Sequence, residues 1–356
     1  MAFDPRDLIR PEILRLKAYQ VADARDMVKL DAMENPYPLP EDLRKAAAGL
    51  VSDAALNRYP DSQAAELRHA IRKRLGVPEG AQILFGNGSD ELIQLIALAL
   101  AKPGATILAP EPSFVMYRMI ATFCGMHYVG VPLTEQFSLD PDEMVLRIEQ
   151  HQPAVVFIAY PNNPTGTLFD ADAMARVLHA APGLVVIDEA YHAFAGSSFM
   201  EELRRHPNLL VMRTLSKLGL AALRLGFVAG APQWLAEIDK LRLPYNINSL
   251  TQAIATHLVE NVGRLNAQAA AIVTSRTQLA HALADMPDLR IWQSHANFIL
   301  FRVPNAPRTF DLLKRQRVLI KNLHGTHPML DNCLRVTVGT PGENAIFLNA
   351  LRASLA

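Results

Sequence analysis

Seven short apolar segments recur between residues 82 and 229, and helical patterns separate several of them. Most lack the regular polar alternation of a strand that has one face in water. Strands of this kind are buried on both faces, which requires helices above and below the sheet. The pattern therefore predicts an α/β fold on one mostly parallel, seven-stranded sheet sandwiched by helices. Strands are expected at residues 82–85, 106–109, 127–131, 154–159, 184–187, 209–212 and 226–229.

The sequence changes character after Pro244. Residues 249–286 are alanine-rich and poor in strand patterns, which predicts one or two long helices. Strand-like segments return at 296–302, 318–320 and 333–338, as is typical of a smaller α+β domain. We expect three parts. They are an N-terminal arm (1–34) that packs with the small domain, a large domain (35–248) and a small C-terminal domain (249–356).

Composition bears on the kinds of partner. The 35 basic and 35 acidic residues balance, so no overall field favours nucleic acid or a membrane surface. We find no signal-peptide pattern and no run of about 18 uncharged apolar residues. Cys124 and Cys333 lie far apart without metal-ligand spacing, and we interpret both as buried free thiols in a reducing compartment. We therefore expect a cytoplasmic protein without a bound metal, whose partners are small molecules or a second copy of itself.

Lys217 stands five residues after the expected strand 209–212. A lysine placed where a buried strand gives way to a loop can lose its proton by desolvation, which makes it a candidate Schiff-base nucleophile. A solvated loop lysine is the common alternative. The choice between the two depends on what the upstream segments supply.

A glycine-rich turn at 86–91 (GNGSDE) follows an expected strand and opens an apolar helix. Glycines let the backbone approach an anion, and the free amides of a helix N-terminus favour phosphate. The dinucleotide pattern GxGxxG is absent because Glu91 occupies the third glycine position. A plain turn capped by Ser89 is the alternative. Downstream, Arg224 is either a second phosphate ligand or a surface ion-pair residue.

Other candidate residues follow strand ends, where ligands of open α/β sheets bind. Residues 160–167 (YPNNPTGT) form a rigid loop that presents Asn163. Asp188 either caps the next segment or pairs with a pyridine nitrogen and keeps it protonated. Tyr191, three residues on, could then bind a phenolic oxygen. Phe114 either stacks on a flat ring or belongs to the core.

Four motifs in this order resemble the pyridoxal-phosphate-dependent enzymes of the aspartate-aminotransferase fold, also called fold type I. They are GSDE (88–91), PNNPTG (161–166), DEAY (188–191) and TLSK (214–217). Two more, LNRYP (56–60) and CLRVTVGT (333–340), narrow the resemblance to the class II histidinol-phosphate aminotransferase family. The likeness spans the chain from about Glu34 to Thr340 and implies pyridoxal 5'-phosphate in the large domain.

The resemblance implies a role for each residue that matches a motif. Lys217 would hold the cofactor covalently and move a proton between the substrate's α-carbon and the cofactor. Asp188 would pair with the ring nitrogen, and Tyr191 and Asn163 with the phenolic oxygen. The other implied contacts are Phe114 on the ring face and, for the phosphate, Ser89, Asp90, Glu91, Ser216, Arg224 and a homodimer partner's Tyr59.

The same resemblance implies a transfer of the amino group between L-histidinol phosphate and 2-oxoglutarate, in histidine biosynthesis. Arg335 would hold the substrate's phosphate or carboxylate, and Lys321 stands where relatives often place a second arginine. Tyr19, Asn35 and Tyr245 would line the mouth of the site.

The sequence departs from many relatives at two further points. The spacing from Lys217 to Arg224 is one residue shorter, and Phe114 replaces a tyrosine. Two alternatives share the fold: a threonine-phosphate decarboxylase and a broad aromatic aminotransferase. A non-catalytic cofactor-binding regulator would carry a basic DNA-binding segment, which we do not expect before Glu34. A nicotinamide-dependent dehydrogenase lacks support because the glycine pattern fails.

Overall fold

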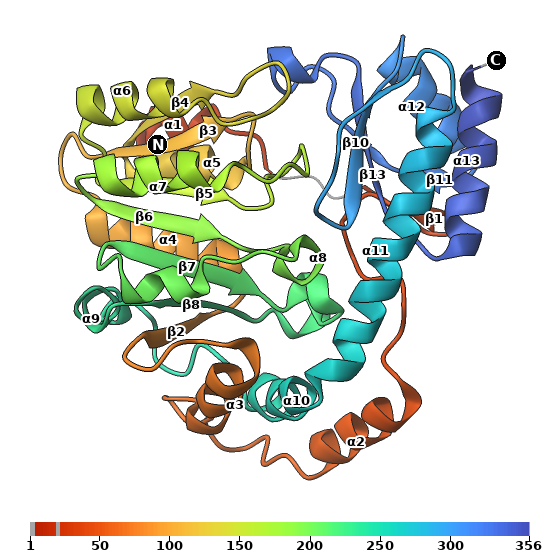
Figure 1. Cartoon of the computed structure of the whole chain (residues 1–356). Helices are drawn as coiled ribbons and strands as arrows, with labels where there is room; N and C mark the ends of the chain where they lie inside the picture. Colours follow the sequence, from red (N-terminus) through yellow and green to blue (C-terminus); the bar gives the residue numbers. More distant parts are fainter. Residues whose placement is uncertain (1–3, 19–21, 356) are drawn as a thin grey trace.

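The structure is a computed structural model that describes residues 4–18 and 22–355 (Figure 1). At its centre lies a seven-stranded sheet with the strand order β2-β8-β7-β6-β5-β3-β4. β8 runs antiparallel to β2 and β7, and all other neighbours are parallel. The predicted mostly parallel sheet is confirmed. Its strands are β2 (Gln82–Gly86), β3 (Thr106–Glu111), β4 (His127–Pro132), β5 (Val155–Ala159), β6 (Leu184–Asp188), β7 (Leu209–Thr214) and β8 (Gly226–Gly230).

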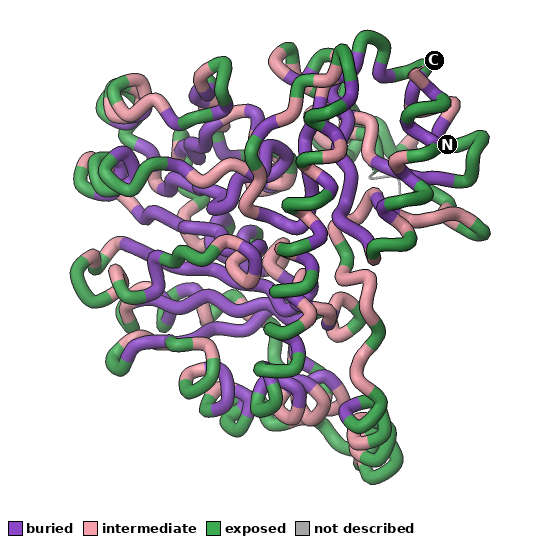
Figure 2. Tube along the Cα trace, turned by 45° about the vertical axis from the view of Figure 1, so that its right-hand side comes forward, coloured by how far each residue is buried: buried purple, intermediate pink, exposed green. Residues whose placement is uncertain are grey.

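Strand side chains alternate between two apolar layers, one on each face of the sheet. In β5, Val155 and Phe157 belong to one layer and Val156 and Ile158 to the other, and all four are fully buried. Figure 2 shows the same burial along the central strands. Full burial of one such side chain stabilises the fold by about 1.5–3 kcal/mol. Helices α4 (Ser89–Leu100), α5 (Met116–Cys124) and α9 (Pro232–Asp239) complete the first layer. Helices α3 (Ala65–Leu75), α6 (Pro141–His151) and α7 (Ala171–Ala180) are among those that complete the second.

The start of α4 differs from the starts of its neighbours. Asp140 and Asp170 cap α6 and α7 by accepting hydrogen bonds from the first amides, a contact worth about 1 kcal/mol. The residue before α4 is Gly88, which has no side chain to offer. The first amides of α4 therefore stay available to a ligand.

The C-terminal part contains a four-stranded antiparallel sheet in the order β12-β13-β10-β9. The predicted helical region forms two helices, α10 (Ser249–Glu260) and α11 (Val262–Ala284), and Figure 1 shows α11 running from α10 towards this smaller sheet. The expected strand 318–320 is divided into β11 and β12, which belong to different sheets. The remaining elements are β9 (Arg290–Ile291), β10 (Phe298–Arg302), α12 (Ala306–Arg315), β11 (Val318–Leu319), β12 (Lys321–Asn322), β13 (Cys333–Thr337) and α13 (Pro341–Leu355).

The N-terminal segment contacts this C-terminal part. β1 (Val28–Lys29) pairs in parallel with β11 and forms a separate two-stranded sheet. Leu30 continues the contact. Its amide donates to the Leu319 carbonyl, and its carbonyl accepts from the Thr337 amide. The division of the chain into 1–34, 35–248 and 249–356 stays a prediction.

Burial of the cysteines differs from the expectation at one position. Cys333 is buried within β13, whereas Cys124 is only half-buried because it ends α5. Within residues 4–18 and 22–355, no helix combines the length and apolarity needed to cross a membrane. The same residues contain no group of three His, Cys, Asp or Glu side chains arranged to hold a metal ion.

Candidate active site

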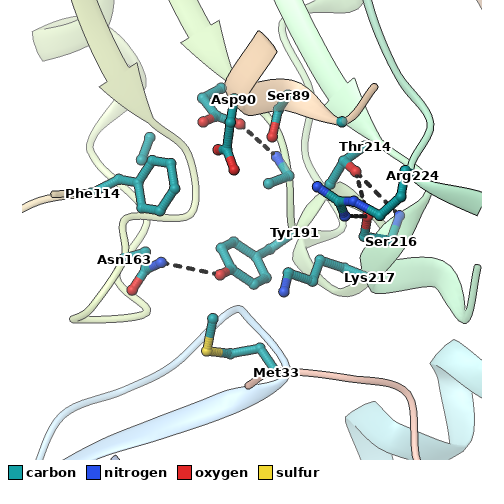
Figure 3. A pocket seen from close by; sticks show the side chains of 14 residues that line it. Met33, Ser89, Asp90, Phe114, Asn163, Tyr191, Thr214, Ser216, Lys217 and Arg224 are labelled. Atoms are coloured by element: carbon teal, nitrogen blue, oxygen red, sulfur yellow. Dashed lines mark hydrogen bonds between the residues drawn. The ribbon is translucent and has the colours of Figure 1, made fainter. Parts of the chain in front are cut away.

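The ends of β5, β6 and β7 converge on a cavity of about 120 Å³ (Figure 3). Parallel strands deliver their carboxyl ends to one edge of a sheet, so residues far apart in sequence meet there. Nine of the eleven residues predicted to bind a cofactor line this cavity: Ser89, Asp90, Phe114, Asn163, Asp188, Tyr191, Ser216, Lys217 and Arg224. Met33, Gly88, Ala159, Ala190 and Thr214 complete the lining.

Asp188 is the last residue of β6, and its side chain is only 4% exposed. Its carboxylate accepts hydrogen bonds from the Tyr117 hydroxyl at 2.9 Å and from the Ala190 amide at 3.1 Å. Burial raises the pKa of Asp188 to about 7, although both hydrogen bonds act in the opposite direction. A cation placed beside this carboxylate would therefore stabilise its charged form.

Lys217 lies in a short 3-10 helix, η3 (Ser216–Leu218), directly after β7. Its Nζ donates to the Ala32 carbonyl at 3.1 Å and lies 6.0 Å from the centroid of the Tyr191 ring. Burial, and to a smaller degree the charge of Arg335, lower the pKa of Lys217 to about 8. A larger share of this amine is neutral near pH 8 than for a lysine in water, as a nucleophile requires.

Asn163 connects the cavity to the C-terminal part of the chain. Its Nδ2 donates to the Tyr191 hydroxyl at 3.2 Å, and its Oδ1 accepts from Arg335 Nη1 at 2.5 Å. Arg335 lies on β13, is 6% exposed and also donates to the Asp31 carbonyl at 3.2 Å. The predicted substrate-binding arginine and two predicted cofactor-binding residues thus form one hydrogen-bonded chain.

The N-terminus of α4 and the Arg224 side chain form the opposite end of the cavity. A Cβ atom on Gly88 would lie 2.7 Å from Nη2 of Arg224, so only glycine lets the guanidinium pack against this turn. Arg224 Nη1 donates to the Ser216 hydroxyl at 3.4 Å. A Cβ on Gly226 would meet the Ser89 nitrogen at 2.8 Å. Two glycines therefore allow the close packing at this end.

The short spacing between Lys217 and Arg224 still brings Arg224 to the cavity. The chain between them folds into two 3-10 helices, η3 and η4 (Ala221–Leu223). Arg224 follows in the left-handed region with φ 48°. The tight turns of this helix type accommodate the loop in few residues.

Two predicted site residues are placed next to the cavity without lining it. The Glu91 carboxylate accepts from the Asn87 amide at 2.6 Å and thereby holds the glycine turn. Asn35 donates to Gln268 on α11 at 3.0 Å and packs against Gly219, whose Cβ would lie 2.9 Å from it. Both side chains support loops that carry cavity residues.

Tyr59 and Tyr245 lie outside the cavity of their own chain. Their rings stack with centroids 4.5 Å apart, and Tyr59 is 81% exposed. Tyr19 falls outside the described residues. Lys321 and Arg335 line a second, neighbouring cavity of about 380 Å³.

Sequence reasoning missed two residues that position the site. Tyr117 is fully buried near the start of α5, but nothing in the sequence indicates its bond to Asp188. Asn162 is fully buried and donates to the Pro112 carbonyl at 3.0 Å, while it accepts from Ser113 at 2.7 Å. Asn162 therefore joins the loop after β3 to the loop after β5.

The residue that follows Asp188 in the chain, Glu189, forms a buried ion pair. Glu189 is fully buried, and its carboxylate lies 2.8 Å from Nη2 of Arg213, which is 5% exposed. Arg213 also donates to the Leu75 carbonyl at 2.9 Å and to the Ser198 hydroxyl at 2.8 Å. The pair joins the ends of β6 and β7, which carry Asp188 and precede Lys217.

The fold and the site together indicate the class of protein to which the chain belongs. The features that carry this are the seven-stranded sheet, the lysine after β7 and the aspartate that ends β6. The chain belongs to the aminotransferase class I and II family, which it matches over residues 25–351. It is 53% identical over 347 residues to histidinol-phosphate aminotransferase 2 of Nitrosococcus oceani, covering 97% of this chain and 96% of that protein. It is 51% identical over 352 residues to histidinol-phosphate aminotransferase of Chromobacterium violaceum, covering 99% of both. The solved histidinol-phosphate aminotransferase of Clostridium acetobutylicum superposes with a TM-score of 0.84 at 25% identity, covering 91% of this chain and 98% of that one.

Proposed function

We propose that this protein is a pyridoxal-phosphate-dependent aminotransferase that moves an amino group between L-histidinol phosphate and 2-oxoglutarate. One observation carries the reaction type: Lys217 and the buried Asp188 line the same cavity, each with a shifted pKa. The substrate assignment draws support from relatives of that name at 53% and 51% identity over nearly the whole chain. The reaction is a step of histidine biosynthesis.

The residues present fit the cofactor at both of its ends. At one end, the uncapped amides of α4, the Ser216 hydroxyl and the Arg224 guanidinium form a cradle for a phosphate. At the other, the Asp188 carboxylate suits a protonated ring nitrogen. Phe114 would cover the ring face, and Asn163 and Tyr191 would donate to its phenolic oxygen. When bound, the cofactor supplies a ring that withdraws electrons from the substrate's α-carbon.

The chain's own residues supply the proton movements. The neutral form of Lys217 Nζ would hold the cofactor covalently until the substrate's amine replaced it. The same Nζ would then act as the base that moves a proton between the substrate's α-carbon and the cofactor. Asp188 would hold the ring nitrogen in its protonated form, which its buried position favours because an uncompensated carboxylate there is unfavourable.

The second cavity is suited to an anionic substrate. Lys321 and Arg335 stand directly opposite each other on β12 and β13, and both line it. The guanidinium carbon of Arg335 lies 5.1 Å from the centroid of the Phe298 ring, and this contact helps to orient the guanidinium group. Two adjacent cations can hold the phosphate of one substrate or a carboxylate of the other.

We also propose a homodimer in which Tyr59 reaches the cofactor phosphate of the partner subunit. The exposed Tyr59–Tyr245 stack supports this arrangement, since large exposed aromatic pairs are common at interfaces. Light scattering after size exclusion checks it, and a monomeric active enzyme would contradict it. Two free cysteines support a cytoplasmic location.

The test of the substrate is a visible-spectrum titration of the purified enzyme with histidinol phosphate and then with threonine phosphate. We expect the cofactor spectrum to change with histidinol phosphate and the corresponding ketone to form. Release of carbon dioxide from threonine phosphate, without ketone from histidinol phosphate, would replace the proposal with the decarboxylase. A panel of aromatic amino acids distinguishes the broad aminotransferase.

A further inference from the structure

The second cavity extends away from the cofactor site. Met33, Phe114 and Asn163 line both cavities, so the two spaces adjoin at these side chains. Arg335 is bonded to Asn163 and therefore lies at the junction. A substrate anchored at Lys217 and Arg335 must direct its remaining arm into the rest of the second cavity.

That cavity also holds a charged cluster that no step proposed above uses. Glu111 ends β3, and its two carboxylate oxygens accept from Arg118 Nη2 at 2.7 and 2.9 Å. Arg118 in turn lies with its guanidinium carbon 4.4 Å from the centroid of the Tyr128 ring. Together with the bond from Arg118 Nε at 3.2 Å, these contacts hold the Glu111 carboxylate at the cavity wall. Oε1 accepts two of the bonds and Oε2 only one, so Oε2 can accept a further donor.

Gly130 on β4 makes room for this carboxylate. A Cβ atom at position 130 would lie 2.2 Å from Oε2 of Glu111 and 2.4 Å from its carboxyl carbon. Any other residue there would displace the acid from its place on the wall. The position of Glu111 thus depends on a neighbouring strand as well as on Arg118.

His327 faces the cluster from the C-terminal part of the chain. Its Nδ1 accepts the Met329 amide at 3.2 Å, so Nδ1 carries no proton and Nε2–H is the donor. Within residues 4–18 and 22–355, Nε2 has no hydrogen-bond partner. Burial lowers the pKa of His327, although the charge of Glu111 opposes the shift. The ring is therefore a neutral donor at the cavity wall.

We propose that Glu111, Arg118 and His327 form a two-way subsite for the substrate arm that Arg335 does not hold. Glu111 accepts the N–H of the imidazole ring of histidinol phosphate. Arg118 and His327 Nε2–H donate to the distal carboxylate of glutamate and 2-oxoglutarate. The inference rests on the proposed function, which requires one site to accept a ring with an N–H donor and a carboxylate in turn. Glu111 supplies the acceptor for the ring N–H, and Arg118 and His327 supply the donors for the carboxylate.

The test compares the two half-reactions in variants. Each amino donor, histidinol phosphate or glutamate, is titrated separately into the cofactor-loaded enzyme, and the half-saturating concentration is read from the visible spectrum. Glu111→Gln keeps the shape and loses the charge. We expect it to raise the value for histidinol phosphate about tenfold, as for a lost hydrogen bond to a charged group, and that for glutamate less than about twofold.

Two further variants and a control complete the design. His327→Phe should raise the half-saturating concentration of glutamate about tenfold, and His327→Gln, which keeps a donor, should restore most of it. Gly130→Ala should act like Glu111→Gln although it keeps the acid. Asp142→Asn removes an exposed carboxylate paired with Arg176 and should change neither half-reaction.

The outcomes separate the two proposals. If the wild-type enzyme responds to glutamate and not to histidinol phosphate, the proposed function fails and this inference fails with it. If it responds to both, and Glu111→Gln shifts both values equally or neither, this inference alone is wrong.

Discussion

Asp188→Asn should make the cofactor-free protein more stable while it removes activity. The folded-state pKa of Asp188, about 7, lies above its ordinary value of 3.8 because the carboxyl is buried. Between these two pH values the folded protein holds this proton more tightly than the unfolded chain does. The contribution of this group to the free energy of unfolding therefore falls as the pH rises from 3.8 to about 7. Above pH 7 it changes no further.

The size of the effect follows from the same two values. A shift of about three pKa units corresponds to a cost of at most about 4 kcal/mol above pH 7, at about 1.4 kcal/mol per unit. At pH 5.5 the cost is about 2 kcal/mol, since only the interval above 3.8 counts. Asparagine carries no charge and can keep one acceptor for the Ala190 amide and one donor for the Tyr117 oxygen.

The assay is urea unfolding of the cofactor-free proteins at pH 5.5 and 8.5, followed by circular dichroism. We expect the variant to be more stable than the wild type at both values, with the larger difference at pH 8.5. Added pyridoxal phosphate should stabilise the wild type more than the variant, because the ring nitrogen compensates the buried charge only in the wild type. An Asp188→Asn protein that is equally or less stable at pH 8.5 would refute the reasoning, and so would one that keeps most of its activity.

Three further outcomes are expected. Lys217→Ala should abolish both turnover and the visible absorption of the purified protein, and an unchanged spectrum would remove Lys217 from the reaction. Tyr117→Phe removes a donor to Asp188, so it should raise the pKa of that carboxyl further and weaken cofactor binding at pH 7 about tenfold, measured by fluorescence titration. In an Asp188→Asn background, Tyr117→Phe should have little effect on cofactor binding if the two residues act together. Arg213→Met leaves the Glu189 carboxylate buried without its cation and should lower the free energy of unfolding by about 3–5 kcal/mol in urea, whereas a loss under about 1 kcal/mol would contradict the ion pair's importance.

The sequence predicted the large sheet well because its strands are buried on both faces. A segment such as 155–159, apolar at every position, satisfies both layers of the core and cannot be mistaken for a strand with one face in water. The same property drew attention to Asp188, which directly follows the segment 184–187, and to Lys217, which stands five residues after the segment 209–212. Their chemistry followed from the resemblance to the family. The boundaries of β11 and β12 were less predictable, because short strands depend on partners such as Arg335 rather than on their own pattern.

The sequence did not reveal which site residues contact one another, because these contacts are tertiary. Tyr117 and Asp188 are separated by 71 residues, and Asn163 and Arg335 by 172. No local periodicity encodes these pairs, because each side chain only has to suit its own helix or strand. They become visible once the strand order places β3, β5 and β6 side by side and brings β13 over their ends.

Substrate choice depends most on such long-range contacts. The motifs at 88–91, 161–166, 188–191 and 214–217 contribute residues to the first cavity, whereas the second cavity is built mainly from residues 111–128 on one wall and 321–335 on the other. Two enzymes of this fold can therefore share every cofactor contact and differ in what the second cavity accepts. A threonine-phosphate decarboxylase binds a substrate whose second arm is a carboxylate, which the fixed charge of Glu111 would disfavour while Arg118 and His327 would attract it. The half-saturating concentrations of threonine phosphate in the wild type and in Glu111→Gln would therefore measure how strongly this wall separates the proposed aminotransferase from that alternative.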